Sequence, residues 1–375
     1  MEKPLSVRCR VSTSLGVATR SEYGIRRPGH GARCRGREST VTEGGNLRTE
    51  HLECLACPAC RGPLALSDAA GAVAETVDDG CLSCEGCGEA YSIIGGIPRF
   101  VPSENYASSF GLEWTLHART QYDSHSHRPV SEKRFFGETG WGRDLAGEMI
   151  LEAGSGSGRF TEQAVKTGAM VVSFDYSYAV EANYESNGHN ENLLIVQADI
   201  NAMPFPRRTF DKVFCFGVLQ HTPDPRRSFL SLVAALKPEG DLVADVYAIG
   251  TRSRLLSTYY LLRPFTRRMA PAKLYRFTHR WIDLMWPLAA LLRRIPVVGY
   301  RTNWRLMVPD YTPYALEPEM LKEWAYLDCF DALGPKYDRP QTRRAVRAWC
   351  AEAGLRDVEV KRGYNGIEMH GTAPG

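Results

Sequence analysis

The sequence lacks an apolar run long enough to cross a membrane. Its candidate stretch, residues 281–300, is interrupted by two arginines, two prolines and an acid. A membrane-spanning helix needs about 20 consecutive and mostly apolar residues, so none is expected. No secretory signal precedes the cysteines, and cytoplasmic chains keep thiols reduced. We therefore expect a cytoplasmic chain whose clustered cysteines bind a metal rather than form disulfides.

A strong overall charge is also missing. The 375 residues carry a net charge of +3, with 24% charged and 43% hydrophobic residues. This composition is ordinary for soluble proteins and points to no particular partner. The length is sufficient for one large α/β domain with smaller attachments.

The first fifty residues have no apolar periodicity that would support a helix. Residues 1–50 contain nine arginines among many glycines and serines. Such a segment cannot bury enough apolar surface to offset the entropy lost on ordering, which predicts a disordered basic arm. Its five glutamates disfavour a transit peptide. A native start near Val41 is an alternative interpretation.

What the chain does contain is an unusual glycine pattern. Gly154, Gly156 and Gly158 alternate directly after an apolar run that ends in Glu152, and Arg159 then opens a predicted helix. Glycines at a strand–helix turn let the backbone approach a ligand, since no Cβ stands in the way. A structural turn or a dinucleotide site would give a similar pattern, so the turn alone is weak.

The segments that follow the glycines strengthen this interpretation. A second predicted strand ends at Asp175, roughly 20 residues further on, where a carboxylate can accept hydrogen bonds from ribose hydroxyls. A third predicted strand ends at Asp199. Apolar runs alternating with helical segments predict a parallel sheet covered on both faces. The predicted strands lie within residues 148–153, 169–175, 193–200, 210–217 and 240–247.

In the order of these elements, residues 105–371 resemble the class I S-adenosylmethionine-dependent methyltransferases, specifically the methyltransferase type 11 group. The resemblance implies an α/β Rossmann-like parallel sheet closed by an antiparallel C-terminal strand, with S-adenosyl-L-methionine as cofactor. A dinucleotide-binding pattern would need its third glycine at Arg159, which disfavours a dehydrogenase. The residues implied in cofactor binding are Glu152, Gly154, Ser155, Gly156, Gly158, Asp175, Tyr176, Asp199, Ile200 and Gly217.

His221 is the candidate general base. It follows the fourth predicted strand, at the sheet edge where open α/β folds bind ligands. An imidazole titrates near neutral pH, which suits removal of a proton from an acceptor. The alternative is that His221 only lines the pocket or caps the following turn.

Six of the eleven cysteines fall in one short segment. Cys57 and Cys60 form one pair with two intervening residues, and Cys84 and Cys87 form another. This spacing suits a tetrahedral Zn²⁺ site, and four thiolates leave no open position for catalysis. Residues 51–102 resemble the small zinc ribbon found in front of or beside methyltransferases. We expect a structural Zn²⁺ held by these four, with Cys54 and Cys81 spare.

Residues 103–147 are predicted to form an N-terminal helical cap. Phe110 and Trp114 lie four apart and share a helix face, which fits packing on the sheet as well as cofactor contact. Arg119 and Tyr122 are weaker candidates for cofactor or substrate contact. The nearby histidines are interpreted as solvated loop residues, since no fourth ligand has useful spacing.

Acids are nearly absent from residues 250–309, the predicted lid insertion. From residue 251 onwards the lid contains twelve Lys or Arg and one acid, Asp283. Ordinary surface helices mix charges of both signs, so a merely solvated surface is the less favoured alternative. Basic amphipathic helices suit an anionic substrate or an anionic membrane surface. Peripheral contact at the inner membrane surface is therefore compatible with this sequence.

The C-terminal part, residues 310–375, is assigned with residues 148–249 to the methyltransferase core. A helix ending before Gly354 and a hairpin turn at Asn365-Gly366 fit a closing antiparallel strand. Tyr337, which lies in a segment resembling a recurring one in this group, is a weaker candidate for cofactor or substrate contact.

The resemblance implies methyl transfer to oxygen or carbon of a small or lipid-linked metabolite, and the basic lid favours an anionic one. RNA methylation is the alternative, because a zinc ribbon and a basic lid could both bind RNA. The strand before His221 lacks the Asn/Asp-Pro-Pro-aromatic segment of many amino-methylating nucleic-acid enzymes, which makes RNA the less favoured acceptor. A non-catalytic partner that only binds the cofactor is disfavoured by the intact glycine turn.

Overall fold

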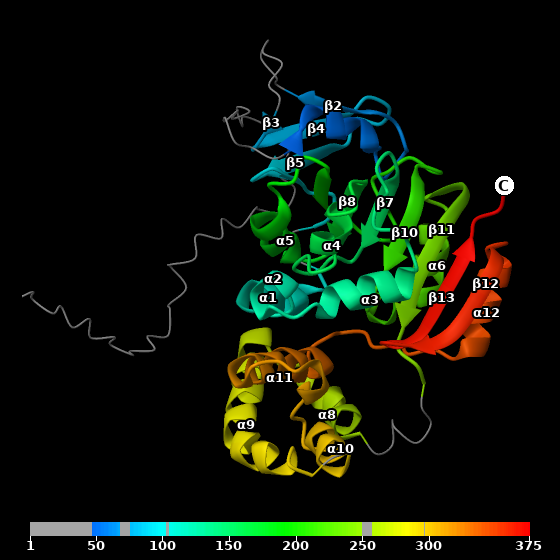
Figure 1. Ribbon diagram of the computed structural model, residues 1–375. Helices are drawn as coiled ribbons and strands as arrows, with labels where there is room; N and C mark the ends of the chain where they lie inside the picture. Colours follow the sequence, from blue (N-terminus) through cyan, green and yellow to red (C-terminus); the bar gives the residue numbers. More distant parts are fainter. Residues whose placement is uncertain (1–46, 68–75, 103–104, 250–256, 296) are drawn as a thin grey trace, which may run out of the picture. The chain divides into compact units, whose positions relative to one another are not determined.

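The computed structural model describes residues 47–67, 76–102, 105–249, 257–295 and 297–375 (Figure 1). The predicted basic arm, residues 1–50, falls almost wholly outside this range, as do Arg252 and Arg254 of the predicted lid. Among the described residues, no helix is both long enough and apolar enough to traverse a lipid bilayer.

A seven-stranded sheet forms the centre of the chain, in the order β12-β13-β11-β10-β7-β8-β9. The five strands from β11 to β9 are parallel, and β13 pairs antiparallel with both β11 and β12. The predicted α/β fold with an antiparallel C-terminal closure is confirmed. The strands are β7 (Met149–Ala153), β8 (Met170–Asp175), β9 (Leu193–Gln197), β10 (Phe210–Cys215), β11 (Leu236–Val246), β12 (Arg356–Gly363) and β13 (Gly366–Thr372).

Both faces of the sheet are covered, because neighbouring residues of its apolar strands point to opposite sides. Ile150 packs in one cluster with α3 (Val130–Thr139), α4 (Thr161–Val165) and α5 (Ala179–Asn187). Leu151 packs in another cluster, which contains α6 (Pro225–Val233), α12 (Arg343–Glu352) and several residues of the ribbon.

The N-terminal ribbon is joined to the core by specific contacts. The Arg61 guanidinium donates hydrogen bonds to the carbonyl oxygens of Met203 and Phe205, at 2.7 and 3.0 Å. Arg99 pairs with Glu181 at 3.1 Å. The ribbon therefore lies against the core rather than on a free linker. Its strands are β1 (Leu47–Arg48), β2 (Leu64–Ser67), β3 (Thr76–Val77), β4 (Gly80–Cys84), β5 (Ala90–Ile94) and β6 (Ile97–Pro98).

The helices after β11 form a layer of their own, which we call the lid layer: α8 (Thr258–Thr266), α9 (Pro271–Leu292), α10 (Val298–Arg305) and α11 (Pro318–Leu333). One apolar cluster joins all four to Leu112 of α1 (Ser108–Leu116). Residues of α11, which lies outside the lid predicted over residues 250–309, pack in this same cluster. Sequence alone assigned α11 to the core because its own helical pattern does not reveal which surface it covers.

Candidate active site and thiol cluster

A cavity of about 930 Å³ lies at the carboxyl ends of the parallel strands. Its lining combines the glycine turn after β7, the ends of β8 to β10, helices α1 and α3, and the lid layer. The carboxyl edge of an open parallel sheet is where such folds bind ligands. Predicted site residues that line the cavity are Gly154, Ser155, Gly156, Asp175, Tyr176, Ile200, Gly217 and His221.

The glycine turn leaves no room for side chains. Gly154 has a φ of +80°, and a Cβ there would lie 2.2 Å from Val218. Gly156, with a φ of +54°, faces the indole of Trp114, 3.1 Å from an ideal Cβ. L-residues with side chains rarely adopt this backbone conformation. The turn thus presents bare backbone to the cavity.

Three of the predicted cofactor residues, Glu152, Gly158 and Asp199, do not line the cavity. The buried Glu152 carboxylate accepts hydrogen bonds from the hydroxyls of Thr161 and Ser173. Gly158 faces Asn183, whose Oδ1 would be 2.1 Å from a Cβ. Burial raises the pKa of Glu152 to about 7. Glu152 and Gly158 therefore support the glycine turn on its side away from the cavity. Sequence could not show this for Glu152, because an acid at a strand end can point into the sheet layer as well as towards a ligand.

Tyr122 belongs to the same supporting network. Its buried hydroxyl donates to the Ser157 carbonyl at 2.5 Å and accepts from Asn187 at 2.8 Å. It does not line the cavity, and Arg119 is exposed and also outside the lining. The structure therefore brings neither of these two weaker candidates to the cavity surface.

Asp175 lies at the end of β8 with its carboxylate towards the cavity. Oδ2 accepts from the Gly156 amide at 3.0 Å, and Oδ1 accepts from the amide and hydroxyl of Ser177. Burial raises the pKa of Asp175, and these bonds oppose that effect. Each carboxylate oxygen can accept two bonds, so the group retains acceptor capacity for a ligand.

The end of β9 contributes Ile200 but not the Asp199 side chain. Asp199 accepts from the amide of Asn201 at 2.8 Å and lies outside the cavity lining. Tyr176 stacks on Tyr106, with ring centroids 4.7 Å apart, and Tyr337 meets the Tyr106 ring edge-on at 5.2 Å. Tyr337 itself is behind the lining.

His221 occupies the 3-10 turn η2 (Leu219–His221) beyond β10. Its Nδ1 lies 3.0 Å from the main-chain carbonyl oxygen of Tyr337. A carbonyl can only accept, so Nδ1 carries the hydrogen and Nε2 keeps its lone pair in the neutral ring. Burial lowers the pKa of His221. The ring is held edge-on between Phe110 and Tyr247, with centroids 5.2 and 5.4 Å away.

The lid layer supplies carboxyls and aromatic rings that sequence analysis did not assign to the site. The Tyr311 hydroxyl donates to Asp328, whose pKa burial raises to about 7. Burial also raises the pKa of Asp331 to about 6. The density of Tyr and Trp between residues 300 and 330 is the one signal that could have indicated this wall. Other residues of the lining from the lid layer include Tyr259, Tyr260, Arg263, Tyr300, Trp304 and Trp324, and Tyr314 joins them from the segment between α10 and α11.

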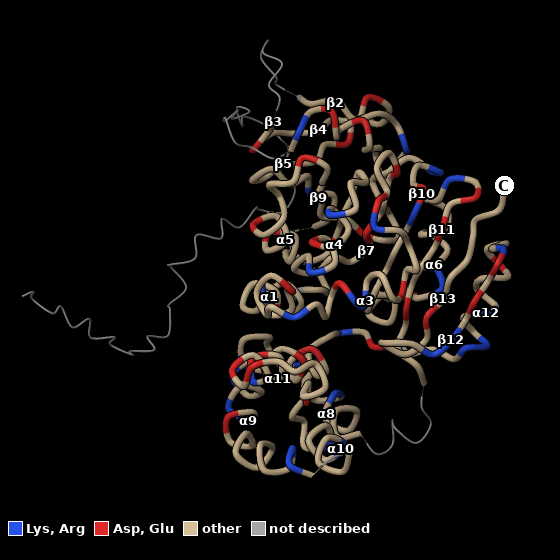
Figure 2. Tube along the Cα trace, in the orientation of Figure 1, with Lys and Arg blue, Asp and Glu red and all other residues tan. Residues whose placement is uncertain are grey.

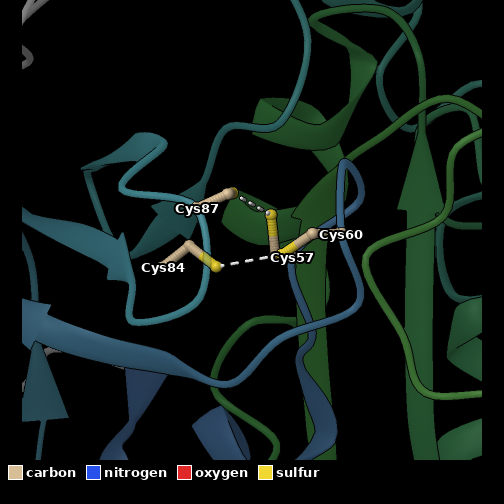
Figure 3. Close-up of side chains that lie close together, drawn as sticks. All are labelled: Cys57, Cys60, Cys84 and Cys87. Carbon is tan, nitrogen blue, oxygen red and sulfur yellow. Dashed lines mark hydrogen bonds between the residues drawn. The ribbon is translucent and has the colours of Figure 1, made fainter.

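The four paired cysteines of the ribbon converge (Figure 3). Their sulfur atoms all lie within 4.8 Å of one another, with Cys57 to Cys87 at 3.6 Å and Cys60 to Cys84 at 3.4 Å. Tetrahedral coordination with Zn–S bonds of 2.3 Å would place the sulfurs about 3.8 Å apart. The donor set therefore fits Zn²⁺, and Cys54 and Cys81 are not part of the cluster.

Two protein families match this chain. The family described as "Methyltransferase domain" matches residues 151–244, and the family described as "Trm112p-like protein" matches residues 48–96. The first covers the strands β7 to β11 that form the cavity edge, and the second covers the ribbon with its thiol cluster.

Curated relatives are named ubiquinone biosynthesis O-methyltransferase. The protein from Coxiella burnetii is 31% identical over 100 residues, which are 26% of this chain and 43% of the relative. The protein from Xanthomonas oryzae pv. oryzae is 28% identical over 183 residues, 47% of this chain and 69% of the relative. The chain thus spans less than half the length of the first of these relatives.

Among solved structures, the complex of the Haloferax volcanii Trm112 methyltransferase activator with a protein described as a methyltransferase is similar at 12% identity. The likeness covers 72% of this chain and 99% of that chain, with a TM-score of 0.43.

Proposed function

We propose that this chain, which belongs to the class I S-adenosylmethionine-dependent methyltransferases and carries an N-terminal ribbon of the Trm112p-like type, methylates a hydroxyl of a small or lipid-linked anionic metabolite. The observation that carries the proposal is the position of His221. His221 lines the same cavity as the glycine turn, and with Nδ1 bonded to the Tyr337 carbonyl its Nε2 keeps a lone pair. The O-methyltransferase names of the curated relatives support oxygen as the acceptor atom.

In this proposal S-adenosylmethionine binds in the part of the cavity formed by the edge of the sheet. The backbone of Gly154, Ser155 and Gly156 would contact the methionine part, and Asp175 would accept from the ribose hydroxyls. Tyr176, Ile200 and Gly217 would flank the adenosine. S-adenosylmethionine supplies a methyl group that is already electrophilic on its sulfonium sulfur, so the protein's main task is positioning. Glu152, Gly158 and Tyr122 would affect cofactor binding indirectly, because they fix the conformation of the glycine turn.

In this assignment His221 accepts the acceptor's hydroxyl proton. The hydrogen on Nδ1 is fixed by the Tyr337 carbonyl, and Nε2 is the nitrogen available as a base. Because burial lowers its pKa, the imidazole is neutral at physiological pH and ready to take a proton. Tyr337 would thus serve as a positioning residue through its main chain.

The test is turnover with isotopically labelled S-adenosylmethionine. Hydroxylated aromatic carboxylates and phosphates, free and lipid-linked, are offered together with a total extract, and the products are identified by mass spectrometry. We expect label in a low-molecular-weight or lipid fraction as a methyl ether, and strongly reduced label with His221→Asn. Label confined to RNA, or cofactor binding without any turnover, contradicts the proposal.

The outer surface of the lid layer supports a lipid-linked acceptor. Along α9, Phe277, Leu284, Leu288 and Leu291 recur at helical spacing and are exposed by 41, 72, 43 and 57%. On α8, Phe265 is 71% exposed and Leu261 63%. Monomeric soluble proteins rarely leave such rows of large apolar side chains in water.

Lys and Arg residues recur along the same helices (Figure 2). Asp283, the acid of α9, pairs with Lys322 of α11 at 2.7 Å. Arg263 and Arg293 pair internally with Asp338 and Asp310 and do not contribute to the surface. An anionic membrane suits this mixture, whereas RNA would favour cations without interleaved leucines. The exposed cations are Arg267, Arg268, Lys273, Arg276, Arg280, Arg294, Arg301 and Arg305.

Vesicle co-flotation tests this surface. We expect binding to vesicles with 30% anionic lipid, weaker binding to zwitterionic vesicles, and loss of binding in Leu284→Asn/Leu288→Asn. Leu116→Asn is the control, since Leu116 is 48% exposed but lies on α1. Equal flotation of the double variant and the parent removes membrane contact from the proposal without affecting the methyl transfer assignment.

The ribbon is proposed to hold one structural Zn²⁺ through Cys57, Cys60, Cys84 and Cys87. Elemental analysis should find one zinc per chain, none in Cys60→Ser, and an unchanged content in Cys54→Ser. Zinc retained in Cys60→Ser would show that the four thiols are not the ligands.

A further inference from the structure

Three arginines of the cavity lining, Arg134, Arg159 and Arg263, lie at least partly buried, and two of them are fully occupied. Arg134 donates to Glu138 and Asp245 at 2.5 Å each. Arg263 donates to the carbonyls of Ala332 and Pro335, at 2.7 and 3.0 Å, and pairs with Asp338. These two arginines hold helices α3 and α8 in place.

Arg159, the third, has no such partner. Among the described residues, no hydrogen bond and no ion pair within 4.0 Å joins its guanidinium, although it is partly buried in the cavity lining. Its guanidinium carbon lies 4.4 Å from the centre of the Phe160 ring. A guanidinium offers five donors in a planar fork, so a full set remains unused.

Two partly buried carboxyls, those of Asp328 and Asp331, attract Arg159 without forming an ion pair within 4.0 Å. Asp328 attracts Arg159 from beyond ion-pair distance, but it already accepts the Tyr311 hydroxyl. With a pKa raised to about 7 by burial, Asp328 is only partly ionised at neutral pH. Burial and the neighbouring Arg134 lower the pKa of Arg159 to about 10, which still leaves it cationic.

A desolvated cation without a partner is costly, and a chain that keeps one in a cavity gains from it when an anion is bound. The surroundings also restrict the shape of that anion. Tyr311 and Tyr314, which lie near Arg159, are part of an aromatic wall with Trp324, at centroid distances of 4.8 Å from Tyr311 and 5.7 Å from Tyr314. A flat or apolar body would pack against this wall.

We propose that Arg159 is the anion-recognition residue of the cavity and forms a bidentate pair with a carboxylate or phosphate group of a bound ligand. The inference rests on the proposed function only in that ligands occupy this cavity. Two sources supply such a group: the acceptor, or the methionine carboxylate of S-adenosylmethionine. Arg159 could pair with the anionic group of either source, and the two binding measurements below distinguish the acceptor from the cofactor.

The acceptor arm uses benzoate and inorganic phosphate as probes, titrated into full-length protein saturated with S-adenosylhomocysteine. If the acceptor supplies the anion, Arg159→Gln weakens binding of at least one probe by 10-fold or more, and Arg159→Lys recovers part of it. Arg128→Gln is the matched control, since Arg128 lines the same cavity but is exposed. It should keep the parent's affinity.

The cofactor arm compares S-adenosylmethionine with its decarboxylated analogue by calorimetry, in the absence of any acceptor. If the cofactor supplies the anion, Arg159→Gln weakens S-adenosylmethionine binding by 10-fold or more and leaves the analogue's affinity unchanged. Neither arm requires turnover, so a failure of the methyl transfer assignment does not affect the result.

Thermal unfolding of the ligand-free variants gives an independent readout. A cation that awaits a ligand does not stabilise the ligand-free fold, so Arg159→Gln should unfold at the parent's temperature or higher. The proposal is overturned if Arg159→Gln keeps every ligand affinity, or if it lowers the unfolding temperature in the same way as removing the paired Arg134 does.

Discussion

The two halves of the cavity are built in different ways. The sheet-edge half is formed by the glycine turn and the strand ends, which follow one another along the chain between Gly154 and His221. The lid half consists of large side chains from α1, α8, α10 and α11, which are distant in sequence. Main-chain geometry allows few substitutions, whereas side chains can be exchanged without altering the fold. The sheet-edge half is therefore suited to a fixed cofactor, and the lid half to a particular acceptor.

Replacing His221, at the border between the halves, should have the largest effect. His221→Asn removes the proton acceptor, and we expect kcat to fall by about 10²- to 10⁴-fold. The affinity for S-adenosylmethionine, measured by calorimetry, should stay within about twofold. A variant with normal kcat would make His221 a lining residue only.

The pH profile sharpens this test. Activity requires neutral His221, so it falls as the pH drops through the imidazole pKa. Because burial lowers that pKa, the acid limb of the parent should lie below the unperturbed value of about 6.5. His221→Asn should lose this limb. A limb that persists in the variant belongs to another group.

Gly158→Ala should disrupt the glycine turn and so impair the sheet-edge half of the cavity but not the lid half. The residue has a φ of +96°, and the new Cβ would lie 2.1 Å from Asn183 Oδ1. We expect cofactor affinity to fall about 100-fold or more and the protein to lose more stability than the roughly 1–2 kcal/mol of a left-handed alanine. Gly140→Ala is the control, because its φ is +65° with nothing within 4 Å of the Cβ. Equal losses of stability and cofactor affinity in the two variants would mean that the Asn183 side chain moves aside at little cost.

Asp175→Ala should weaken the cofactor half without disturbing the lid half. Hydrogen bonds to a charged group contribute about 1.5–3 kcal/mol, which corresponds to roughly 10- to 100-fold in the dissociation constant of S-adenosylmethionine. The benzoate affinity of the cofactor-saturated variant should be that of the parent. Calorimetry with an unchanged cofactor affinity would refute the ribose assignment.

Tyr311→Phe should give the smallest effect and act on the lid half alone. The change removes the hydroxyl that donates to Asp328, at a cost of about 1 kcal/mol. We expect the acceptor's KM to change by about fivefold and cofactor affinity to remain constant. Steady-state kinetics measures both quantities. A change in cofactor affinity in place of the change in the acceptor's KM would show that the two halves of the cavity are coupled.

The sheet-edge half could be predicted from the sequence because its signals are local. The spacing of the glycines, the apolar runs and Asp175 lie within about two dozen residues, and the structure places Asp175 at the cavity. Glu152 and Asp199 show the limit of this reasoning. A strand-end position can be inferred from the pattern, but whether a carboxylate points to a ligand or to a neighbouring hydroxyl or amide depends on packing.

The lid half could not be predicted in the same way. Asp328, Tyr311 and Arg159 meet only after α11 packs beside α9. Arg159 directly follows the glycine turn, yet its significance depends on which carboxyls are near and already bonded. The charge pattern of the lid indicated a basic surface, but it did not distinguish the exposed arginines from Arg263 and Arg293, which form internal pairs.

The partner of the His221 imidazole is a main-chain carbonyl, that of Tyr337. Replacing Tyr337 by alanine leaves its peptide carbonyl in place. A mutational survey of side chains would therefore measure the effect of losing the Tyr337 ring and would miss the contact with His221. Deletions, insertions or a proline that redirects the peptide plane would remove it. Comparisons among related chains would then show a segment of constant length but variable residues at this point, a pattern that residue conservation alone would not identify as part of an active site.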